Sequence, residues 1–345
     1  MIYSIASNLT KSVLSVTRND TESNNIFFNI WSSVFFIILF LNLSGNSLVI
    51  VVIAKDKKFH SMMNCLFANM AFSDFLAGIF AFLWYLANYI DPAWLNEWIC
   101  RLVAANTITV LSGIVSIFSL TAITLERYRA ILKPLEHRMS WCRLKLILFV
   151  IWFFSGICSL PYFIFIKFVD AQNQNRCMFL LGEWEKQLLT ILMFAFVYAC
   201  PNIIICSAYA KIVKHLWFNK ENEEMQESHK ALLQSRKKIT KLLGFVLIVF
   251  NLCVLPNFAI ADFMLSFGAT GYGHAVSFIG FLIQFVSTCV NPLIFFIQSK
   301  QFRNRLFGIL FCRNKRINRW SELRVTVVST KSQVGSISKH CQTAV

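Results

Sequence analysis

Seven charge-poor stretches, each long enough to cross a bilayer, dominate this chain of 345 residues. Six hold no charged residue, and the seventh holds one carboxylate, Asp74. A membrane-spanning helix needs about 20 mostly apolar residues at 1.5 Å rise each. The chain is therefore predicted to be an all-α membrane protein. The uncharged stretches are Ile26–Ala54, Leu102–Leu125, Leu146–Ile166, Gln187–Ala210, Leu242–Ala261 and Ala275–Ser299, and Asp74 lies in Ser61–Ile90.

Composition excludes an ordinary soluble domain, because 57% of the residues are hydrophobic and only 14% are charged. The spans and their short connections occupy most of residues 26–312 and leave no room for a separate soluble enzyme domain. Residues 1–25 are polar and lack the apolar run of a signal peptide. We expect the first span to act as its own insertion signal.

The charge pattern predicts the orientation in the membrane. Of 33 Lys and Arg residues, 27 lie in the first, third and fifth connections and in the C-terminal tail. Basic residues accumulate on the cytoplasmic side of membrane proteins. The N-terminus is therefore predicted to be extracellular and the C-terminus cytoplasmic, in a multi-pass protein of the plasma membrane. The same distribution explains the net charge of +16 without nucleic-acid binding.

Four covalent modifications or bonds follow from this orientation. Asn8 and Asn19 begin tripeptides typical of N-glycosylation on the predicted outer side. Cys100 and Cys177 both fall on that side, where an oxidising environment permits a disulfide. Cys312 follows the last span beside basic residues, which suits palmitoylation, the alternative being a free thiol.

Several motifs fall in order along the spans. These are Gly45-Asn46-Ser47-Leu48-Val49, Asn69-Met70-Ala71-Phe72-Ser73-Asp74, Glu126-Arg127-Tyr128, Trp152, Pro201 with Tyr209, Phe250 with Cys253-Val254-Leu255-Pro256, and Asn291-Pro292-Leu293-Ile294-Phe295. Together they resemble the rhodopsin-like (class A) G-protein-coupled receptors over about residues 30–312. The resemblance implies a seven-transmembrane helix bundle with a short amphipathic eighth helix, in which an extracellular ligand activates heterotrimeric G proteins.

The predicted organisation has four parts. Residues 1–25 form an extracellular arm, 26–299 the seven-transmembrane receptor domain, 300–312 the amphipathic eighth helix, and 313–345 a disordered cytoplasmic tail. Low apolar content predicts the disorder of the tail.

A buried carboxylate needs a partner or a proton, so Asp74 marks a functional centre. In the family this centre holds a sodium ion, and the resemblance implies the same here. Oxygen ligands suit such a hard cation. The alternative is a hydrogen-bonded, hydrated carboxylate without a metal. The expected ligands are Asp74, Ser116, Ser287, Thr288 and Asn291.

The activation switch is expected at the inner ends of the spans. Arg127 either reaches water or pairs with Glu126, and in the family it helps receive the G protein. Many relatives cage this arginine with an acid at the base of span six, where this chain has Arg236. We therefore hypothesise raised basal signalling. The residues assigned to coupling are Glu126, Arg127, Tyr128, Leu135, Tyr209, Phe250, Val254, Pro256, Asn291, Pro292 and Phe295.

Three features depart from the family pattern. Val254 stands where most relatives have tryptophan, and Phe295 replaces a tyrosine. Cys100 precedes Arg127 by two residues more than usual. This spacing predicts a bulge or extra half-turn between them, or a shifted disulfide.

The ligand pocket is expected in the outer half of the bundle. Thr109 stands where amine receptors carry an aspartate, so a peptide or a small neutral molecule is favoured over a monoamine. Acids at the mouth favour a peptide, the alternative being a solvated rim: Asp91, Glu97, Asp170, Glu183 and Glu185. The pocket candidates are Trp84, Tyr85, Asn88, Thr109, Val110, Asn257, Phe258, Asp262, Phe281 and Gln284.

Further partners follow from the inner segments. The connection Lys211–Lys241 offers a basic G-protein footprint, serines and threonines of the tail could recruit arrestin after phosphorylation, and basic residues meet membrane lipids. The ending Thr343-Ala344-Val345 resembles a ligand of PDZ domains.

Three alternative functions can be compared with the sequence. A constitutively active or silent orphan receptor fits the altered switch residues. A seven-span transporter would need internal repeats and several buried charges, whereas only Asp74 is buried. An intramembrane enzyme would need paired acids or metal ligands, and none of the six histidines falls in an uncharged span. The chain is therefore predicted not to be an enzyme.

Overall fold

The computed structural model describes residues 2–56, 60–89, 96–104, 106–133, 140–171, 174–218, 227–267, 273–298 and 300–310. Side chains are described for a smaller set, which leaves out residues 1–28, 88–95, 170–176, 257–278 and 309–345 among others. The chain divides into two compact units, Met1–Ile294 and Phe295–Val345.

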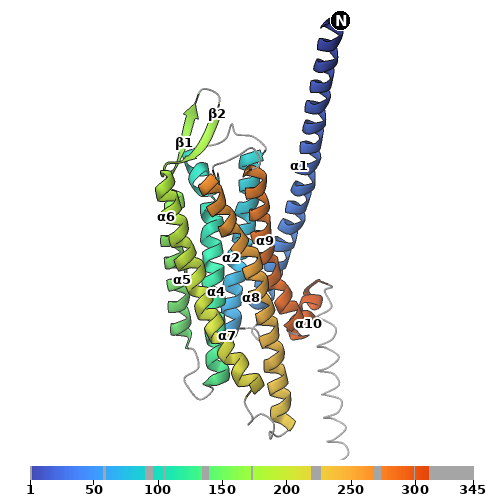
Figure 1. Ribbon diagram of the computed structural model, residues 1–345. Helices are drawn as coiled ribbons and strands as arrows, with labels where there is room; N and C mark the ends of the chain where they lie inside the picture. Colours follow the sequence, from blue (N-terminus) through green and yellow to red (C-terminus); the bar gives the residue numbers. More distant parts are fainter. Residues whose placement is uncertain are drawn as a thin grey trace, which may run out of the picture. The chain divides into compact units, whose positions relative to one another are not determined.

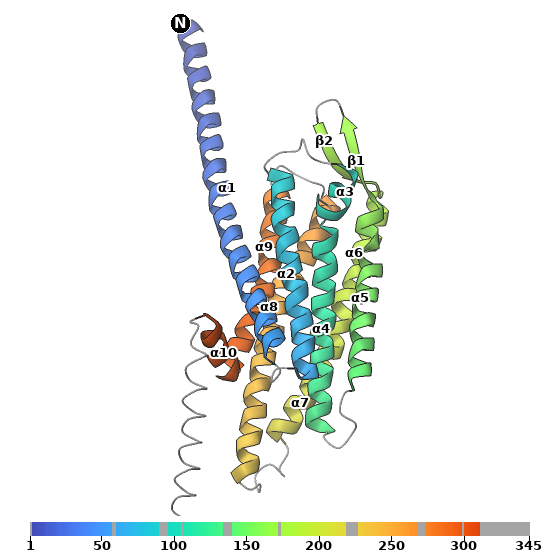
Figure 2. The same ribbon diagram turned by 180° about the vertical axis from the view of Figure 1, so that it is seen from behind.

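The first unit is a bundle of long helices (Figures 1 and 2). In chain order the helices are α1 (Ile2–Lys55), α2 (Met62–Tyr89), the short α3 (Glu97–Ile99), α4 (Thr107–Leu132), α5 (Trp141–Ile164), α6 (Glu183–Met193), α7 (Cys200–Phe218), α8 (Glu227–Phe267) and α9 (Gly273–Gln298), which belongs to the first unit as far as Ile294. Six described segments are long and apolar enough to cross a membrane, and α9 adds the shorter apolar stretch Ile279–Leu293. These segments confirm the predicted seven-helix architecture.

The helix ends differ from several predicted span ends. Helix α1 begins at Ile2, well before the predicted first span, and its membrane-length apolar part is Asn29–Lys55. Helix α5 ends at Ile164, because Ile166 already starts a strand. The fifth span has three segments, α6, a π-helical turn at Phe194–Ala199 and α7. Pro201 follows that turn, as expected where a missing N–H loosens the helical bond pattern.

A two-stranded hairpin, which the hydropathy pattern did not reveal, caps one end of the bundle (Figure 1). Strand β1 (Ile166–Ala171) pairs antiparallel with β2 (Gln174–Phe179), with Phe168 opposite Cys177. We call this end of the first unit the hairpin end. The opposite end, where α4 carries Arg127, is the arginine end.

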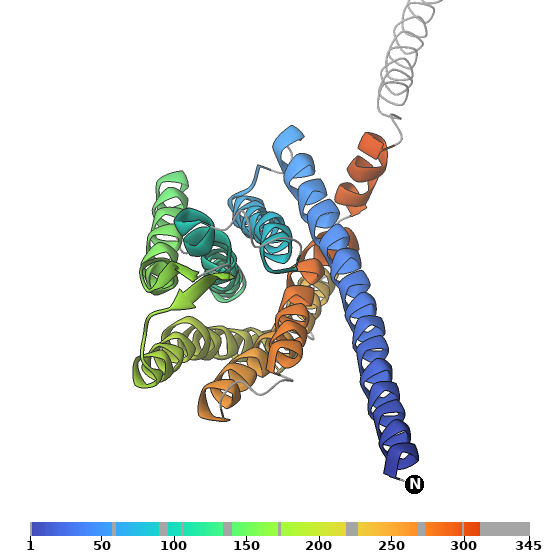
Figure 3. The same cartoon turned by 90° about the horizontal axis from the view of Figure 1, so that it is seen from above.

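Helix α4 lies inside the bundle and packs against α2, α5 and α7 (Figure 3). Asn69 of α2 joins three helices, because its amide donates to Ser119 of α4 and accepts from Trp152 of α5, both at 2.9 Å. A separate apolar core joins α1, α2 and α9 around Phe35 and Phe285. Many large apolar side chains are instead exposed, such as Phe149 and Phe153 of α5, as expected for helices that face lipid.

The second unit contains α10 (Lys300–Leu310), which corresponds to the predicted eighth helix at 300–312. Within this unit, Arg303 donates hydrogen bonds to the carbonyl oxygens of Phe296 and Ile297, at 2.8 and 3.0 Å. Phe296 and Phe307 make an edge-to-face contact. The predicted tail at 313–345 lies outside the described residues.

Candidate functional site

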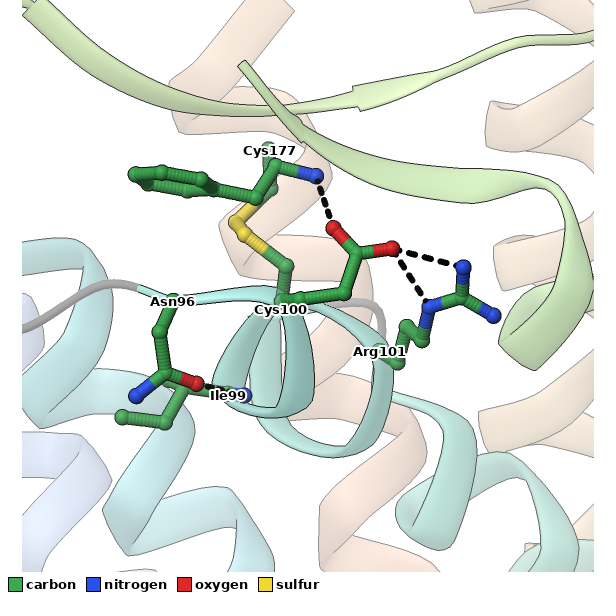
Figure 4. Close-up of a disulfide and its surroundings, with 7 residues drawn as sticks. Asn96, Ile99, Cys100, Arg101 and Cys177 are labelled. Atoms are coloured by element: carbon green, nitrogen blue, oxygen red, sulfur yellow. Dashed lines mark hydrogen bonds and ion pairs between the residues drawn. A yellow bond between two sulfur atoms is a disulfide. The ribbon is translucent and has the colours of Figure 1, made fainter. Parts of the chain in front are cut away.

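The hairpin is bound to the bundle by the predicted disulfide. Cys100 and Cys177 are bonded, with their Cα atoms 5.4 Å apart (Figure 4). Cys100 is fully buried and packs with Ile166 at the start of β1. The bond therefore joins the start of the third span to the second strand of the hairpin.

A second attachment, which the sequence did not predict, lies next to this disulfide. The carboxylate of Glu97 accepts a hydrogen bond from the backbone N–H of Phe168 in β1 at 3.0 Å. Its other oxygen pairs with the Arg101 guanidinium, 2.7 Å from Nε and 2.6 Å from Nη2 (Figure 4). Arg101 also donates to the Phe163 carbonyl at 3.4 Å and lies over the Phe163 ring. Glu97 thus links the third span, the hairpin and the end of α5.

The unusual spacing between Cys100 and Arg127 has a structural cause. A π-helical turn at Cys100–Ala104 precedes α4, and Asn106 adopts a left-handed backbone with φ of 56°. The Thr107 hydroxyl bonds back to the Arg101 carbonyl at 2.5 Å. The predicted third span, Leu102–Leu125, is therefore irregular at its start, in agreement with the first of the predicted alternatives, a bulge or extra half-turn between Cys100 and Arg127.

The described pocket candidates are aromatic, apolar and neutral polar residues of α2, α4 and α9. Trp84 of α2 and Phe281 of α9 have ring centroids 4.9 Å apart. The buried Thr109 hydroxyl has no hydrogen-bond partner among the described residues, and the neighbouring Val110 packs against an apolar cluster of α4 and α6. The amide of Gln284 approaches Gly113, so α9 and α4 lie close together here.

Tyr85 differs from the other candidates. It is buried against α1, where its ring stacks on Phe35 and its hydroxyl donates to Ser32 at 3.1 Å. Its hydroxyl is therefore turned toward α1, contrary to the expectation that it lines a pocket. Four candidates, Asn88, Asn257, Phe258 and Asp262, lie outside the described side chains.

Asp74 occupies the centre of the bundle with only 1% of its surface exposed. Ser116 of α4 donates its hydroxyl proton to one carboxylate oxygen at 2.6 Å, and the Asn291 amide of α9 donates to the other at 2.7 Å. The carboxylate therefore joins α2, α4 and α9. Hydrogen bonds to a charged group contribute about 1.5–3 kcal/mol each. The two bonds to Asp74 therefore stabilise the packing of α2, α4 and α9 against one another.

The other two expected sodium ligands are engaged elsewhere. The Ser287 hydroxyl donates to the Gln284 carbonyl at 2.7 Å. The Thr288 hydroxyl donates to Phe285 at 2.6 Å and accepts from the Asn42 amide of α1 at 2.7 Å. The oxygen donors that fit a cation at Asp74 are therefore Asp74 and Ser116, with the Asn291 side-chain amide beside them.

Asn42 is a polar residue of this centre that the sequence analysis did not identify. Its side chain is fully buried, and Asn46 one turn later bonds to the carbonyl oxygens of both Asn42 and Thr288. Gly78 of α2 lies so close that a Cβ there would collide with the Asn42 side-chain oxygen. The sequence signal for Asn42 is that this asparagine lies one helical turn before Asn46 in an otherwise apolar segment.

The arginine end is connected differently. Arg127 is half-buried, and its Nε atom has no hydrogen-bond partner within the described part of the chain. The Tyr209 hydroxyl of α7 donates to the Thr240 carbonyl of α8 at 3.1 Å. A Cβ at Gly244 would collide with that same hydroxyl. Gly244 therefore leaves the space in which Tyr209 reaches α8.

The remaining switch residues are placed as follows. Phe250 packs against the apolar cluster of α4 and α6, and Val254 is buried with 7% exposure. The Tyr128 ring lies 5.9 Å from the Lys211 ammonium. Pro292 packs so closely on α1 that a Cβ at Gly45 would lie 3.0 Å from its ring. Leu135 and Phe295 have side chains outside the described set, as do Asn8, Asn19 and Cys312.

The seven-span bundle, its central carboxylate and its disulfide-bound hairpin define a seven-helix membrane receptor. The family described as 7 transmembrane receptor (rhodopsin family) matches residues 45–295. The chain belongs to this family, as its motifs indicated. It is a multi-pass membrane protein and a ligand-activated G-protein-coupled receptor, and members of this family are signalling receptors rather than enzymes.

Individual relatives are similar over most of the chain. The galanin receptor 2a of Danio rerio is 27% identical over 94% of this chain and 92% of its own length. The neuromedin-K receptor of Mus musculus is 27% identical over 79% of this chain and 62% of its own. The trissin receptor of Drosophila melanogaster is 31% identical over 57% of this chain and 30% of its own.

Proposed function

We propose that the ligand is a peptide that binds at the hairpin end. The carrying observation is the similarity to the galanin receptor 2a over 94% of this chain and to the neuromedin-K receptor over 79%, both of them peptide-binding receptors. The site chemistry agrees, because Thr109 offers an unpartnered hydroxyl and no carboxylate for an amine. The aromatic pair Trp84 and Phe281 supplies apolar contact area for side chains.

The acidic rim contributes less to peptide selection than its composition suggests. Glu97 is bonded to Arg101 and to the hairpin, and Glu183 pairs with Lys186 at 2.8 Å. A paired carboxylate is a weaker attractor for a cationic ligand. The peptide is therefore recognised mainly by apolar and neutral polar contacts, with the hairpin as one wall.

A G-protein activation assay in cells tests the peptide ligand. Pools of peptides and of small metabolites are applied to cells with and without the receptor. A peptide pool should give a saturable response that Thr109→Val weakens. Ser155→Ala is the matched control, since it also removes a buried hydroxyl without a described partner, but on α5. A response to metabolites alone would overturn the peptide ligand.

The orientation is part of the same proposal: the hairpin end faces outside at the plasma membrane and the arginine end faces the cytoplasm. The excess of Lys and Arg in the connections at the arginine end supports it.

This orientation leads to four further proposals. On the outer side, Asn8 and Asn19 carry glycans. On the inner side, Cys312 is palmitoylated, a phosphorylated tail recruits arrestin, and Thr343-Ala344-Val345 binds a PDZ domain. Glycosidase treatment that shifts the mass of the wild type but not of an Asn8→Gln, Asn19→Gln variant tests the outer side.

A sodium ion at Asp74 would stabilise the resting state, with Asp74 and Ser116 supplying oxygens. Because the Thr288 hydroxyl accepts a hydrogen bond from Asn42, we expect the protein to supply fewer sodium ligands than the five residues that the sequence predicts. Thermal unfolding with sodium or with choline chloride at equal ionic strength tests this. A sodium-specific gain that Asp74→Asn abolishes supports the site.

A second candidate function is constitutive signalling. The unpartnered Arg127 Nε and the absence of an acid at Arg236 favour a weakly locked resting state. The no-ligand arm of the same cell assay measures it.

A further inference from the structure

A hydrogen bond between two residues that were not assigned to the activation switch joins the fifth span to the sixth. Tyr198, in the π-helical turn Phe194–Ala199, donates its hydroxyl proton to the Asn251 side-chain oxygen of α8 at 2.7 Å. The Tyr198 side chain is buried. The Asn251 side-chain amide donates to the Leu247 carbonyl of its own helix, also at 2.7 Å. Both polar atoms of the Asn251 side chain are therefore hydrogen-bonded.

Asn251 needs this partner because of its place in the sixth span. It is the only residue with an amide side chain in the run Leu242–Pro256, and it lies near the middle of the predicted span Leu242–Ala261. A polar group in such apolar surroundings is costly unless it is hydrogen-bonded. Val254, three residues further along and so on the same helical face, has no polar side-chain atom. Asn251 thus specifies which side of α8 packs against the π-helical turn.

The segment that carries Tyr198 is itself packed against α4. Val197, the residue before Tyr198, belongs to an apolar cluster with Ile114 of α4. Further along the fifth span, Ile212 of α7 belongs to a second apolar cluster with Ile131 of α4. A helix that is hydrogen-bonded to the fifth span is therefore held near α4 as well.

A second tyrosine places the two spans in the same register. Tyr209 donates to the Thr240 carbonyl of α8 at 3.1 Å, and Tyr198 donates to Asn251. The two tyrosines are eleven residues apart, and so are their two partners on the antiparallel helix. Eleven residues make about three helical turns, or about 16 Å, so both hydroxyls lie on one face of the fifth span. The inner half of the sixth span is thus attached to the fifth span at two levels.

We propose that the Tyr198–Asn251 bond restrains the sixth span against the fifth in the resting receptor and that its release accompanies activation. Because the fifth span is packed on α4, α8 can move away from α4 only by separating from the fifth span too. A hydrogen bond between neutral side chains of membrane helices is weak enough for a ligand to break. Tyr198 and Asn251 are therefore positioning residues for α8. The inference rests on the G-protein coupling of the receptor and does not require the ligand to be a peptide.

Nucleotide exchange on a purified G protein tests this restraint without a ligand. The full-length receptor is purified into nanodiscs, and the exchange rate is measured per folded receptor. Tyr198→Phe and Asn251→Leu should each raise the rate about three- to tenfold, the equivalent of one hydrogen bond between membrane helices. Thr190→Val is the matched control, because the described hydrogen bond of its hydroxyl goes to the Lys186 carbonyl of its own helix, α6. It should leave the rate unchanged.

Two double variants separate a specific bond from a general loss of packing. Tyr198→Phe with Asn251→Leu removes both partners of one bond, so the rate should rise no further than in either single variant. Tyr198→Phe with Tyr209→Phe removes two bonds about 16 Å apart along the helix. Effects at distant sites are additive in free energy, so in this second pair the two increases should multiply.

Three outcomes would overturn the proposal. An unchanged exchange rate in both single variants, with a lower unfolding temperature, would make the bond a packing contact only. A slower rate would assign the bond to the active state. Multiplied effects in the Tyr198→Phe, Asn251→Leu pair would mean that the two side chains act separately.

Discussion

The two ends of the bundle are held together in different ways. At the hairpin end, the Cys100–Cys177 disulfide and the Glu97 carboxylate fix the paired strands β1 and β2 to the third span. At the arginine end, the Tyr209 hydroxyl joins α7 to α8 at Thr240, and the Arg127 Nε has no described partner. A neutral hydrogen bond contributes about 0.5–1.5 kcal/mol. Ligand coupling energies of about 1–3 kcal/mol exceed the contribution of that one hydrogen bond, while the apolar contact of Ile131 with Ile212 and Leu216 continues to pack α4 against α7.

The largest expected effect comes from breaking the fixed end. Cys100→Ser removes the disulfide, and loss of a native disulfide typically costs about 2–5 kcal/mol. The unfolding temperature of the purified receptor should fall sharply, and the ligand response should be lost. Cys142→Ser, at an exposed free cysteine, is the control and should leave both unchanged. Equal unfolding temperatures for the two variants would show that the disulfide does not hold the hairpin.

A second prediction concerns the centre between the two ends. Gly78→Ala would push a methyl group into the Asn42 side-chain oxygen and disturb its bond to Thr288. Overpacking of this kind costs about 1–3 kcal/mol. Gly156→Ala is the matched control, because a Cβ there meets nothing within 4 Å. Thermal unfolding should separate the two variants, and a stable Gly78→Ala receptor would contradict the close approach.

A smaller effect is expected at the movable end. Gly244→Ala would displace the Tyr209 hydroxyl from Thr240, which removes a contact between α7 and α8 in this structure. Basal G-protein activation should rise about two- to tenfold, the equivalent of one lost hydrogen bond. Tyr209→Phe, which removes only the hydroxyl, should act in the same direction. Unchanged basal activity in both variants would mean that this bond does not restrain the helices.

The smallest effect is expected at Arg236, which stands where many relatives have an acid. Arg236→Glu should give Arg127 an opposite charge and lower the basal activity, by a few-fold at most, because ion pairs near the surface contribute about 0.2–1 kcal/mol. The comparison variant Arg236→Gln removes the repulsion without adding an acid, so its effect should be intermediate. Unchanged basal activity with Arg236→Glu would contradict the hypothesis that the absence of an acid near Arg127 raises basal signalling.

The sequence predicted most of the spans, because a bilayer requires long apolar runs whatever the side-chain detail. It also predicted the Cys100–Cys177 bond and a polar centre at Asp74. It did not predict the hairpin, since its strands of six residues each carry little periodic signal. The Glu97 attachment depends on the approach of a backbone N–H from β1, which no sequence spacing specifies.

Two other features are only partly indicated by the sequence. The two extra residues between Cys100 and Arg127 indicated a break, but the left-handed Asn106 depends on tertiary packing. The family resemblance places Thr288 among the sodium ligands, as a polar side chain at a depth similar to that of Asp74. The structure turns its hydroxyl to Asn42, because that buried amide needs an acceptor.

The most direct test of a fixed and a movable end is a pair of distance measurements by spin labelling. Labels at Arg143 and Ser235 report on the arginine end, and labels at Trp98 and Trp184 report on the hairpin end; all four positions are exposed. When a nucleotide-free G protein binds the purified receptor, the first distance should lengthen by several ångströms while the second stays the same. An unchanged first distance, or a change confined to the hairpin end, would contradict the account.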